Sequence, residues 1–275
     1  MPPPTALTGW PPWAVMWALS AAVFAACKWA TWRHTPAPPA PAWRHTAYLV
    51  AWPGLDAKAF LDPRPLSPDR RPRASEWAFA CAKLSFGAAL LWVGCPLLPA
   101  DAALLRGWVG MTGLIFVLHF GSFHLLSCAG RAAGVDAKPL MNCPVLAESV
   151  SAFWGQRWNT AFRDLTHRFL FRPLAGRIGA RAGVAAGFLF SGIVHDLVIS
   201  LPAGGGYGWP TLYFTLQGLG LLAERSKLGK RIGFGAGWRG RAFTALVTVG
   251  PAFGLFHPPF VREVVLPFLD VIGAN

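Results

Sequence analysis

The sequence predicts an all-α, polytopic integral membrane protein, a helical bundle with an amphipathic helix at the membrane interface. Of its 275 residues, 54% are hydrophobic and only 13% are charged, and the mean hydropathy is +0.41. A soluble domain of this size carries about a quarter charged residues. The apolar residues come in runs separated by basic loops, and no stretch is polar enough to fold separately. We therefore expect a single membrane domain over residues 1–275.

Seven apolar segments are expected to form the bundle. The first four have about the 20 residues that a helix needs to cross a bilayer. The last three are shorter, which favours tilted, re-entrant or partly buried helices. In chain order the segments are Trp13–Thr31, Trp77–Leu98, Ala103–Cys128, Gly183–Pro202, Trp209–Ala223, Ala242–Phe256 and Phe260–Ile272.

The charged residues predict the orientation of these segments. The formal net charge is +13, and Lys and Arg cluster in the loops after the first, third and fifth segments. The alternate connections, around Pro99–Asp101 and Ala203–Gly208, contain neither residue, and only Arg262 departs from the pattern. The positive-inside rule then places the basic loops in the cytoplasm, the N-terminus outside and the C-terminus inside. We expect a multi-pass protein, in the cell inner membrane if the source is bacterial. We expect no nucleic-acid partner, because the cations do not form one patch.

Several kinds of chemistry are not indicated by the motifs. The five cysteines include no CxxC pair, and His119 and His124 are five residues apart without further histidines nearby, so we expect no metal and no cofactor. The sequence has no G-x-S-x-G elbow, no P-loop and no dinucleotide fingerprint. An enzyme of this composition would need a substrate that is already activated.

The loop between the third and fourth segments contains the predicted amphipathic helix, over Glu148–Phe171. At 100° per residue one face is apolar, and Arg157 and Arg168 flank it. The apolar face consists of Trp154, Trp158, Ala161, Phe162, Leu165 and Phe169. This pattern is typical of a basic helix lying at the membrane surface. Asn159 falls at the edge of the face, where its amide either contacts an entering substrate or only solvates the boundary.

His195 lies in the middle of the fourth segment, Gly183–Pro202, where an ionisable side chain is costly unless it faces a cavity or a partner. Ser191 is one helical turn earlier, so its hydroxyl could orient the imidazole. Asp196 points about 100° away on a helix and is not expected to pair with it. From the residues alone, His195 is either a general base or a hydrogen-bonding link between helices.

Two motifs resemble the wax synthase branch of the membrane-bound O-acyltransferase superfamily. They are FWGQRWN (Phe153–Asn159), followed by a basic stretch ending in Arg-Pro, and SGIVHD (Ser191–Asp196), and their Asn and His lie about 35 residues apart. With HFGSFHLLSCAGRAAGVDAKPL upstream and ISLPAGGGYGWPTLYFTLQG downstream, the resemblance covers an acyltransferase core over residues 119–226. It implies that Asn159 and His195 form an active site in a membrane helical fold.

The resemblance also implies a reaction, the transfer of a fatty acyl group from acyl-CoA to the hydroxyl of a lipophilic alcohol. His195 would take the hydroxyl proton, and Asn159 would hold the thioester or the developing oxyanion. The candidate substrate-binding residues are Trp154, Arg157, Trp158, Arg163 and Ser191. The two arginines could attract the phosphates of CoA. The expected partners are acyl-CoA as co-substrate, the alcohol and membrane lipids, with the entrance facing the cytoplasm.

Three alternatives remain open. The acceptor could be an isoprenoid, a sterol, a diacylglycerol or a sugar. The chain could be a transporter in which His195 and Asp196 relay protons. It could also be a lipid-binding protein without catalytic activity, in which case Asn159 and His195 would tolerate substitution.

Overall fold

The protein folds into helices, as predicted. The computed structural model describes residues 9–36 and 39–274, and none of these is in a β-strand. The chain forms two compact units that alternate along the sequence. The first unit contains the chain up to Ala21, Cys143–Trp158 and Thr166–Phe268, and the second contains Ala22–Asn142, Asn159–Leu165 and the chain from Leu269. Whether residues 1–275 act as a single membrane domain stays a prediction.

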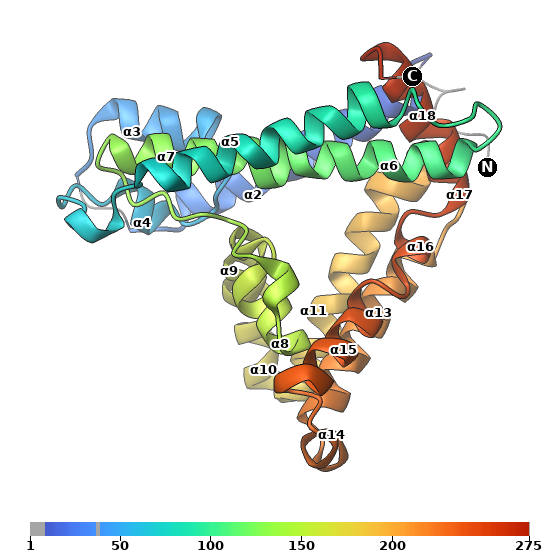
Figure 1. Ribbon diagram of the computed structural model, residues 1–275. Helices are drawn as coiled ribbons and strands as arrows, with labels where there is room; N and C mark the ends of the chain where they lie inside the picture. The colour runs from blue at the N-terminus through green and yellow to red at the C-terminus, as the bar shows by residue number, and fades with distance from the viewer. Residues whose placement is uncertain (1–8, 37–38, 275) are drawn as a thin grey trace. The chain divides into compact units, whose positions relative to one another are not determined.

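The helices of the first unit begin with the first half of α2 (Pro12–Arg33) and resume after residue 143 (Figure 1). They are η5 (Pro144–Leu146), α8 (Val150–Ala152), η6 (Phe153–Arg157), η7 (His167–Phe171), α10 (Arg172–Ile178), α11 (Ala180–His195), η8 (Asp196–Ser200), α12 (Leu201–Ala203), α13 (Trp209–Arg225), α14 (Lys227–Ile232), α15 (Gly237–Thr248), α16 (Ala252–Leu255), α17 (Pro258–Phe260) and η9 (Val261–Val265). Helix α18 (Leu266–Val271) begins in this unit and ends in the other.

The second unit continues α2 and extends to residue 142. Its helices are α3 (Ala42–Thr46), η1 (Ala47–Ala51), α4 (Ala57–Leu61), η2 (Pro68–Arg70), α5 (Ala74–Ala89), η3 (Leu90–Gly94), α6 (Ala103–Ile115), η4 (Phe116–Ser122), α7 (Phe123–Ala132) and nearly all of α9 (Thr160–Thr166). In Figure 1 the long helices α5 and α6 lie side by side, and they contact each other.

The helices confirm a polytopic membrane protein but not the number of spans. Within the described residues, four helical stretches are long and apolar enough to cross a membrane: Pro12–Arg33, Pro68–Gly94, Ala103–Ala132 and Ala180–Ala203. They correspond to the first four predicted segments. The sixth and seventh form a pair, Gly237–Leu255 and Pro258–Val271, bent by 59°, which would make a fifth span. The fifth segment is α13, whose 17 residues are slightly short for a full crossing.

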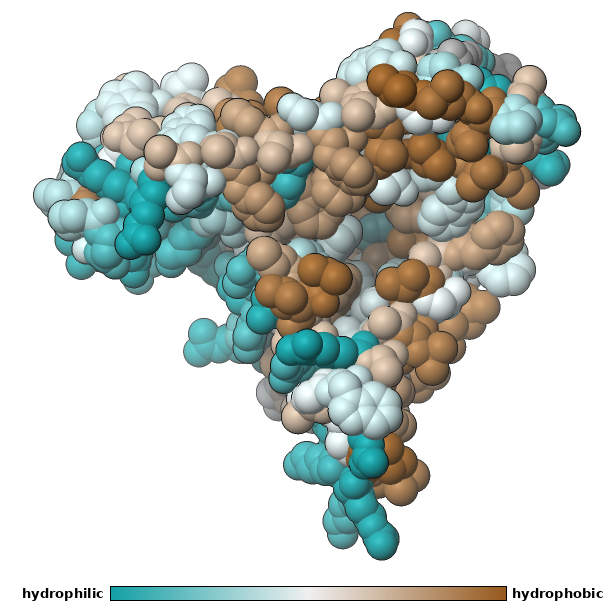
Figure 2. Space-filling view, viewed as in Figure 1, coloured by the Kyte–Doolittle hydropathy of each residue, from teal (hydrophilic) through white to brown (hydrophobic). Residues whose placement is uncertain are grey.

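Large hydrophobic side chains are exposed on the spanning helices, as expected for lipid-facing surfaces. Examples are Phe79 and Phe86 on α5 and Leu189, Phe190 and Ile193 on α11. Figure 2 shows hydrophobic residues over much of the visible face.

In the first unit, α11 packs directly against α13. Gly192 permits this close approach, because a Cβ atom at this position would lie 2.7 Å from the Cα atom of Thr211. The glycine of the SGIVHD motif therefore brings the histidine-bearing helix into contact with its neighbour. A larger side chain would push the two helices apart.

The second unit has a hydrophobic core around Tyr48, Trp52 and Phe60. Lys28, which is almost fully buried, places its ammonium 3.6 Å from the centre of the Tyr48 ring and donates a hydrogen bond to the Gly54 carbonyl. A cation–π contact of this kind offsets part of the cost of burying an ammonium group. Burial raises the pKa of Tyr48 to about 12.

The continuous helix predicted over Glu148–Phe171 is wrong in its middle. The π-helical turn η6 ends at Trp158, whose backbone is extended, and Asn159 has a left-handed backbone with φ of 41°. Asparagine tolerates this conformation better than most residues. The Thr160 N–H donates to the Leu140 carbonyl and not to a preceding helical turn. Periodicity could not reveal the break, because the apolar spacing continues across Asn159.

Candidate active site

His195 is the last residue of α11, at the point where the helix changes to the π-helical turn η8. Its Nδ1 atom lies 2.7 Å from the Ser191 carbonyl oxygen. A carbonyl can only accept a hydrogen bond, so Nδ1 carries the hydrogen and Nε2 keeps its lone pair. The backbone thereby selects the tautomer that can accept a proton at Nε2. π-Helical turns of this kind are frequent at functional sites.

Ser191 acts through its backbone. The prediction that its hydroxyl orients the imidazole is wrong in this detail, because Oγ donates to the Gly187 carbonyl at 3.1 Å, while the Ser191 carbonyl receives the hydrogen bond from His195. A serine hydroxyl on a helix commonly bonds the carbonyl one turn earlier. The orienting contact is therefore available to any residue at position 191.

The ring of Phe214 connects the two sequence motifs within the first unit. It is buried on α13, and its centroid lies 4.3 Å from that of His195. The Phe214 centroid also lies 5.7 Å from that of Trp154. The Trp154 ring in turn contacts the Phe188 ring edge-on, with centroids 5.8 Å apart. The tryptophan of FWGQRWN and the histidine of SGIVHD thus pack on the same phenylalanine.

Gln217 fixes Trp154 in this position. Its side chain is fully buried, accepts a hydrogen bond from Trp154 Nε1 at 3.2 Å and donates one to the Val247 carbonyl at 2.7 Å. Sequence reasoning missed this residue. The sequence did contain a signal for Gln217, because a polar amide in an apolar segment is as unusual as a histidine there.

Asp196 accepts four hydrogen bonds and forms the N-terminal cap of α13. Its Oδ1 accepts from Ser200 Oγ and from the Gly208 N–H, both at 2.8 Å. Its Oδ2 accepts from the Thr211 N–H at 3.0 Å and from the Thr211 hydroxyl. A carboxylate at a helix N-terminus is stabilised by the exposed N–H groups and the helix dipole. As expected, Asp196 does not pair with His195; its role is to attach α13 to α11.

A buried histidine supports the same carboxylate. His257 Nδ1 accepts from the Phe260 N–H at 3.2 Å, so its Nε2 carries the hydrogen and donates to Ser200 Oγ at 3.1 Å. Ser200 in turn donates to Asp196. This chain of hydrogen bonds joins the bent C-terminal pair of helices to the end of α11.

The other candidate residues lie around the break at Asn159. Trp158 stacks on Phe153 with ring planes 11° apart, and Arg157 Nη1 donates to the Cys143 carbonyl at 3.3 Å. The Asn159 N–H lies 3.2 Å from Met141 Sδ, and Arg163 Nε donates to the Asp164 carboxylate at 2.8 Å. Asp164 thus offsets part of the charge with which Arg163 was expected to attract phosphate.

Asn159 and Arg163 belong to the second unit, whereas His195, Ser191, Trp154, Arg157 and Trp158 belong to the first. The geometry within the first unit therefore brings Trp154 to His195 through Phe214. The predicted role of Asn159 rests on its motif, and that of Arg163 on its charge.

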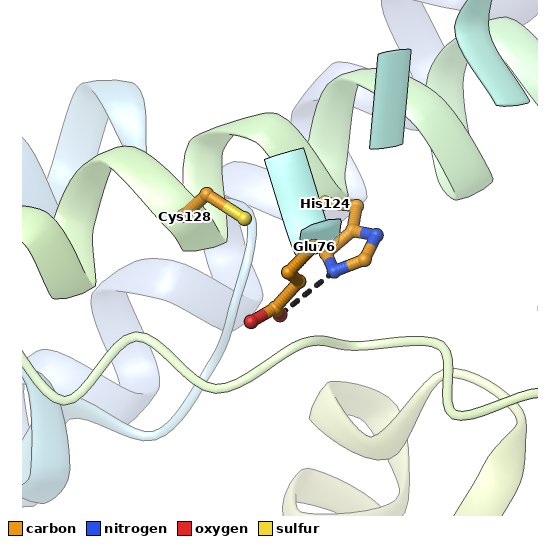
Figure 3. A group of neighbouring side chains, drawn as sticks. All are labelled: Glu76, His124 and Cys128. Atoms are coloured by element: carbon orange, nitrogen blue, oxygen red, sulfur yellow. Dashed lines mark hydrogen bonds and ion pairs between the residues drawn. The ribbon is translucent and has the colours of Figure 1, made fainter. Parts of the chain in front are cut away.

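Three side chains in the second unit have the composition of a metal site. Glu76, His124 and Cys128 place one potential ligand atom each within 4.8 Å of one another (Figure 3). Their lone pairs are already engaged, since Lys83 Nζ lies 2.7 Å from His124 Nδ1, and His124 Nε2 lies 3.0 Å from Glu76 Oε1. Arg131 donates to both Glu76 oxygens and, at 3.6 Å, to Cys128 Sγ. This arrangement is an ion-pair network between α5 and α7.

We expect Glu76→Ala to destabilise the protein, because it leaves the Arg131 guanidinium without its carboxylate. The Glu76 side chain is 27% exposed, so the loss should fall below the ~3–5 kcal/mol typical of a fully buried pair. Thermal unfolding in detergent would measure it. Asp62→Asn, which removes an exposed ion pair with Arg64, should leave the midpoint almost unchanged. Equal shifts in the two variants would contradict the network.

Comparison with known proteins finds a similarity in the part of the chain that contains these motifs. A sequence profile described as the membrane bound O-acyl transferase family matches residues 137–216. This range includes every candidate site residue from Trp154 to His195. Residues 137–216, the family segment, are similar to the membrane bound O-acyl transferase family.

Curated proteins that this chain resembles, at modest identity, include long-chain-alcohol O-fatty-acyltransferases. Probable long-chain-alcohol O-fatty-acyltransferase 7 of Arabidopsis thaliana is 30% identical over 149 residues, which are 47% of this chain and 42% of the relative. Probable long-chain-alcohol O-fatty-acyltransferase 3 of the same plant is 31% identical over 151 residues, 48% of this chain and 42% of the relative. The match therefore spans less than half the length of these relatives.

Proposed function

We propose that this protein transfers a fatty acyl group from acyl-CoA to the hydroxyl of a lipophilic alcohol, with His195 as the general base. The observation that carries the proposal is the hydrogen bond from Nδ1 to the Ser191 carbonyl, which leaves the Nε2 lone pair for the substrate. The relatives' names, which specify long-chain alcohols, support the acceptor class.

The reaction is a direct transfer. The Nε2 atom takes the hydroxyl proton while the alcohol oxygen attacks the thioester carbonyl. The carbon–sulfur bond breaks, the CoA thiolate leaves, and the imidazolium returns a proton to the sulfur. The thioester is already activated, so no acyl-enzyme intermediate is required. We assign Asn159 the role of holding the thioester or the oxyanion, and this assignment rests on the motif alone.

The first-unit residues divide between the chemistry and its support. Phe214 and Trp154 provide an apolar wall beside the imidazole, which favours a lipophilic acceptor. Arg157, half-buried beside Trp158, is proposed to attract CoA phosphates from the cytoplasmic side. That orientation rests on the distribution of charge in the loops.

The geometry argues against the proton relay. A relay through Asp196 would need a carboxylate that exchanges protons freely, whereas its two oxygens accept four hydrogen bonds. Both oxygens are therefore engaged in holding the start of α13.

The test is a panel of acceptors presented to membranes that contain the expressed chain. Labelled acyl-CoA would be supplied with a long-chain linear alcohol, an isoprenoid alcohol, a sterol, a diacylglycerol or a sugar, and the products identified by mass. We expect an ester with the linear alcohol. Ester formation with another member of the panel would reassign the acceptor, and no ester with any of them, relative to membranes without the chain, would contradict the proposal.

A further inference from the structure

The segment from the end of α13 to the beginning of α15 forms a basic element that the proposed reaction does not use. This α14 loop, Ser226–Arg241, contains five cations and no acidic residue. Its cations are Lys227, Lys230, Arg231, Arg239 and Arg241. The loop belongs entirely to the first unit.

The root of the α14 loop is held firmly. Ser226 Oγ accepts from the Gly229 N–H at 3.0 Å and caps α14, and a Cβ atom at Gly229 would lie 2.1 Å from the Ala223 carbonyl oxygen. At the other end, Arg241 forms a 2.6 Å ion pair with Glu148. The hydrogen bond from Arg241, with a second from the Gly237 N–H, holds the pKa of Glu148 below its usual range.

The tip of the loop exposes apolar side chains next to cations. Leu228 is 65% exposed and Trp238 75%, and Ile232 is also exposed. Leu228 and Ile232 lie one turn apart on α14, and both are exposed. In Figure 2 the lower tip, over α14, carries hydrophilic and hydrophobic side chains beside each other.

The basic side chains at the tip are also exposed. Lys227 and Arg231 form a second pair one turn apart on α14, beside the apolar pair. Arg239 packs its guanidinium 5.5 Å from the Trp238 ring centre. The described salt bridges of the α14 loop include only that of Arg241, at the root.

We propose that the α14 loop binds the anionic phospholipid headgroups of the membrane in which the protein lies. Exposed Leu, Ile and Trp side chains suit the boundary between headgroups and acyl chains, where tryptophan is enriched. Lysine and arginine beside them attract anionic lipids. A free phosphate or the phosphates of CoA would satisfy the cations but leave three large apolar side chains in water. The membrane surface accommodates both the cations and the apolar side chains.

This inference does not depend on the proposed reaction, because it concerns lipid binding by a loop outside the family segment. Its test uses the purified full chain in detergent and measures bound lipid by native mass spectrometry. Phosphatidylglycerol and phosphatidylcholine with identical acyl chains would be the probes. We expect the wild-type chain to bind phosphatidylglycerol at least roughly tenfold more tightly.

Matched variants test whether the preference for phosphatidylglycerol comes from the α14 loop or from the positive charge of the protein as a whole. The triple change K227Q/K230Q/R231Q should abolish most of this preference, and K58Q/R71Q/R73Q, which removes three exposed cations of the second unit, should keep it. L228S/W238S should weaken phosphatidylglycerol binding although the charges remain. Thermal unfolding would verify that each variant is folded, and K227R/K230R/R231K should behave as wild type.

Two results would overturn the proposal. One is an unchanged preference for phosphatidylglycerol in the folded K227Q/K230Q/R231Q variant. The other is displacement of phosphatidylglycerol by excess coenzyme A together with no effect of L228S/W238S, which would identify the loop as a phosphate site for CoA. Acyl transfer does not enter either readout, so failure here leaves the proposed reaction untouched.

Discussion

Replacing His195 with alanine is expected to lower acyl transfer by roughly 10²–10⁴-fold, the range that a positioned general base contributes. The change removes Nε2, and with it the atom that takes the hydroxyl proton. Binding of acyl-CoA should remain, because neither the cationic residues nor the thioester contacts proposed for it involve the imidazole. Initial rates with purified protein and a titration of acyl-CoA binding would measure the two effects.

Two further variants distinguish the base from the hydrogen bond that orients it. His195→Asn keeps an N–H near the position of Nδ1, able to donate to the Ser191 carbonyl, but has no base at the position of Nε2. It should be as inactive as the alanine variant. His167→Ala removes an exposed histidine of the same family segment and should keep full activity. Activity in His195→Asn within a few fold of wild type would contradict the role of Nε2.

The second large effect is expected from Asp196→Ala. The change removes the acceptor of the exposed Gly208 N–H and of the part-buried Thr211 N–H at the start of α13, a loss of roughly 1–3 kcal/mol in total. The thermal midpoint should fall by roughly 2–10 °C for a loss of this size. Acyl transfer should fall as well, because α13 carries the Phe214 ring on which His195 rests.

Asp196→Asn is the informative comparison for this cap. Its amide oxygen can still accept two of the four hydrogen bonds, so stability and activity should lie between those of wild type and the alanine variant. Asp101→Ala, in an exposed loop of the second unit, should change neither. If Asp196→Ala were as stable as wild type but inactive, Asp196 would have a direct part in the chemistry and the capping role would be wrong.

The parts of the fold that the sequence predicted are those set by composition and length. The first four spanning stretches were predicted because a helix needs ~20 apolar residues to cross a bilayer. In the structure they coincide with the apolar runs of the sequence. The sixth and seventh predicted segments correspond to two helices that meet at a bend between Leu255 and Pro258 and together would make one span. Their join could not be predicted, because length alone does not tell whether short helices form one span.

The candidate site was predicted in part. His195 was found because an imidazole in an apolar helix is conspicuous, and Trp154 because of its motif. The hydrogen bond to the Ser191 carbonyl was not predicted, since periodicity places side chains on a face but says nothing of which backbone atom they meet. The break at Asn159 was missed because the helical pattern continues across it, although one residue with a left-handed backbone is enough to end a helix.

The central claim, direct acyl transfer to an alcohol, is tested most directly by the stoichiometry of a single reaction. Purified wild-type chain in lipid nanodiscs would receive labelled acyl-CoA and a long-chain alcohol, and the free CoA thiol and the ester would be measured together over time. The account predicts one ester for each thiol released, with both falling together in His195→Ala. Release of CoA thiol without ester would show hydrolysis in place of transfer and would contradict it.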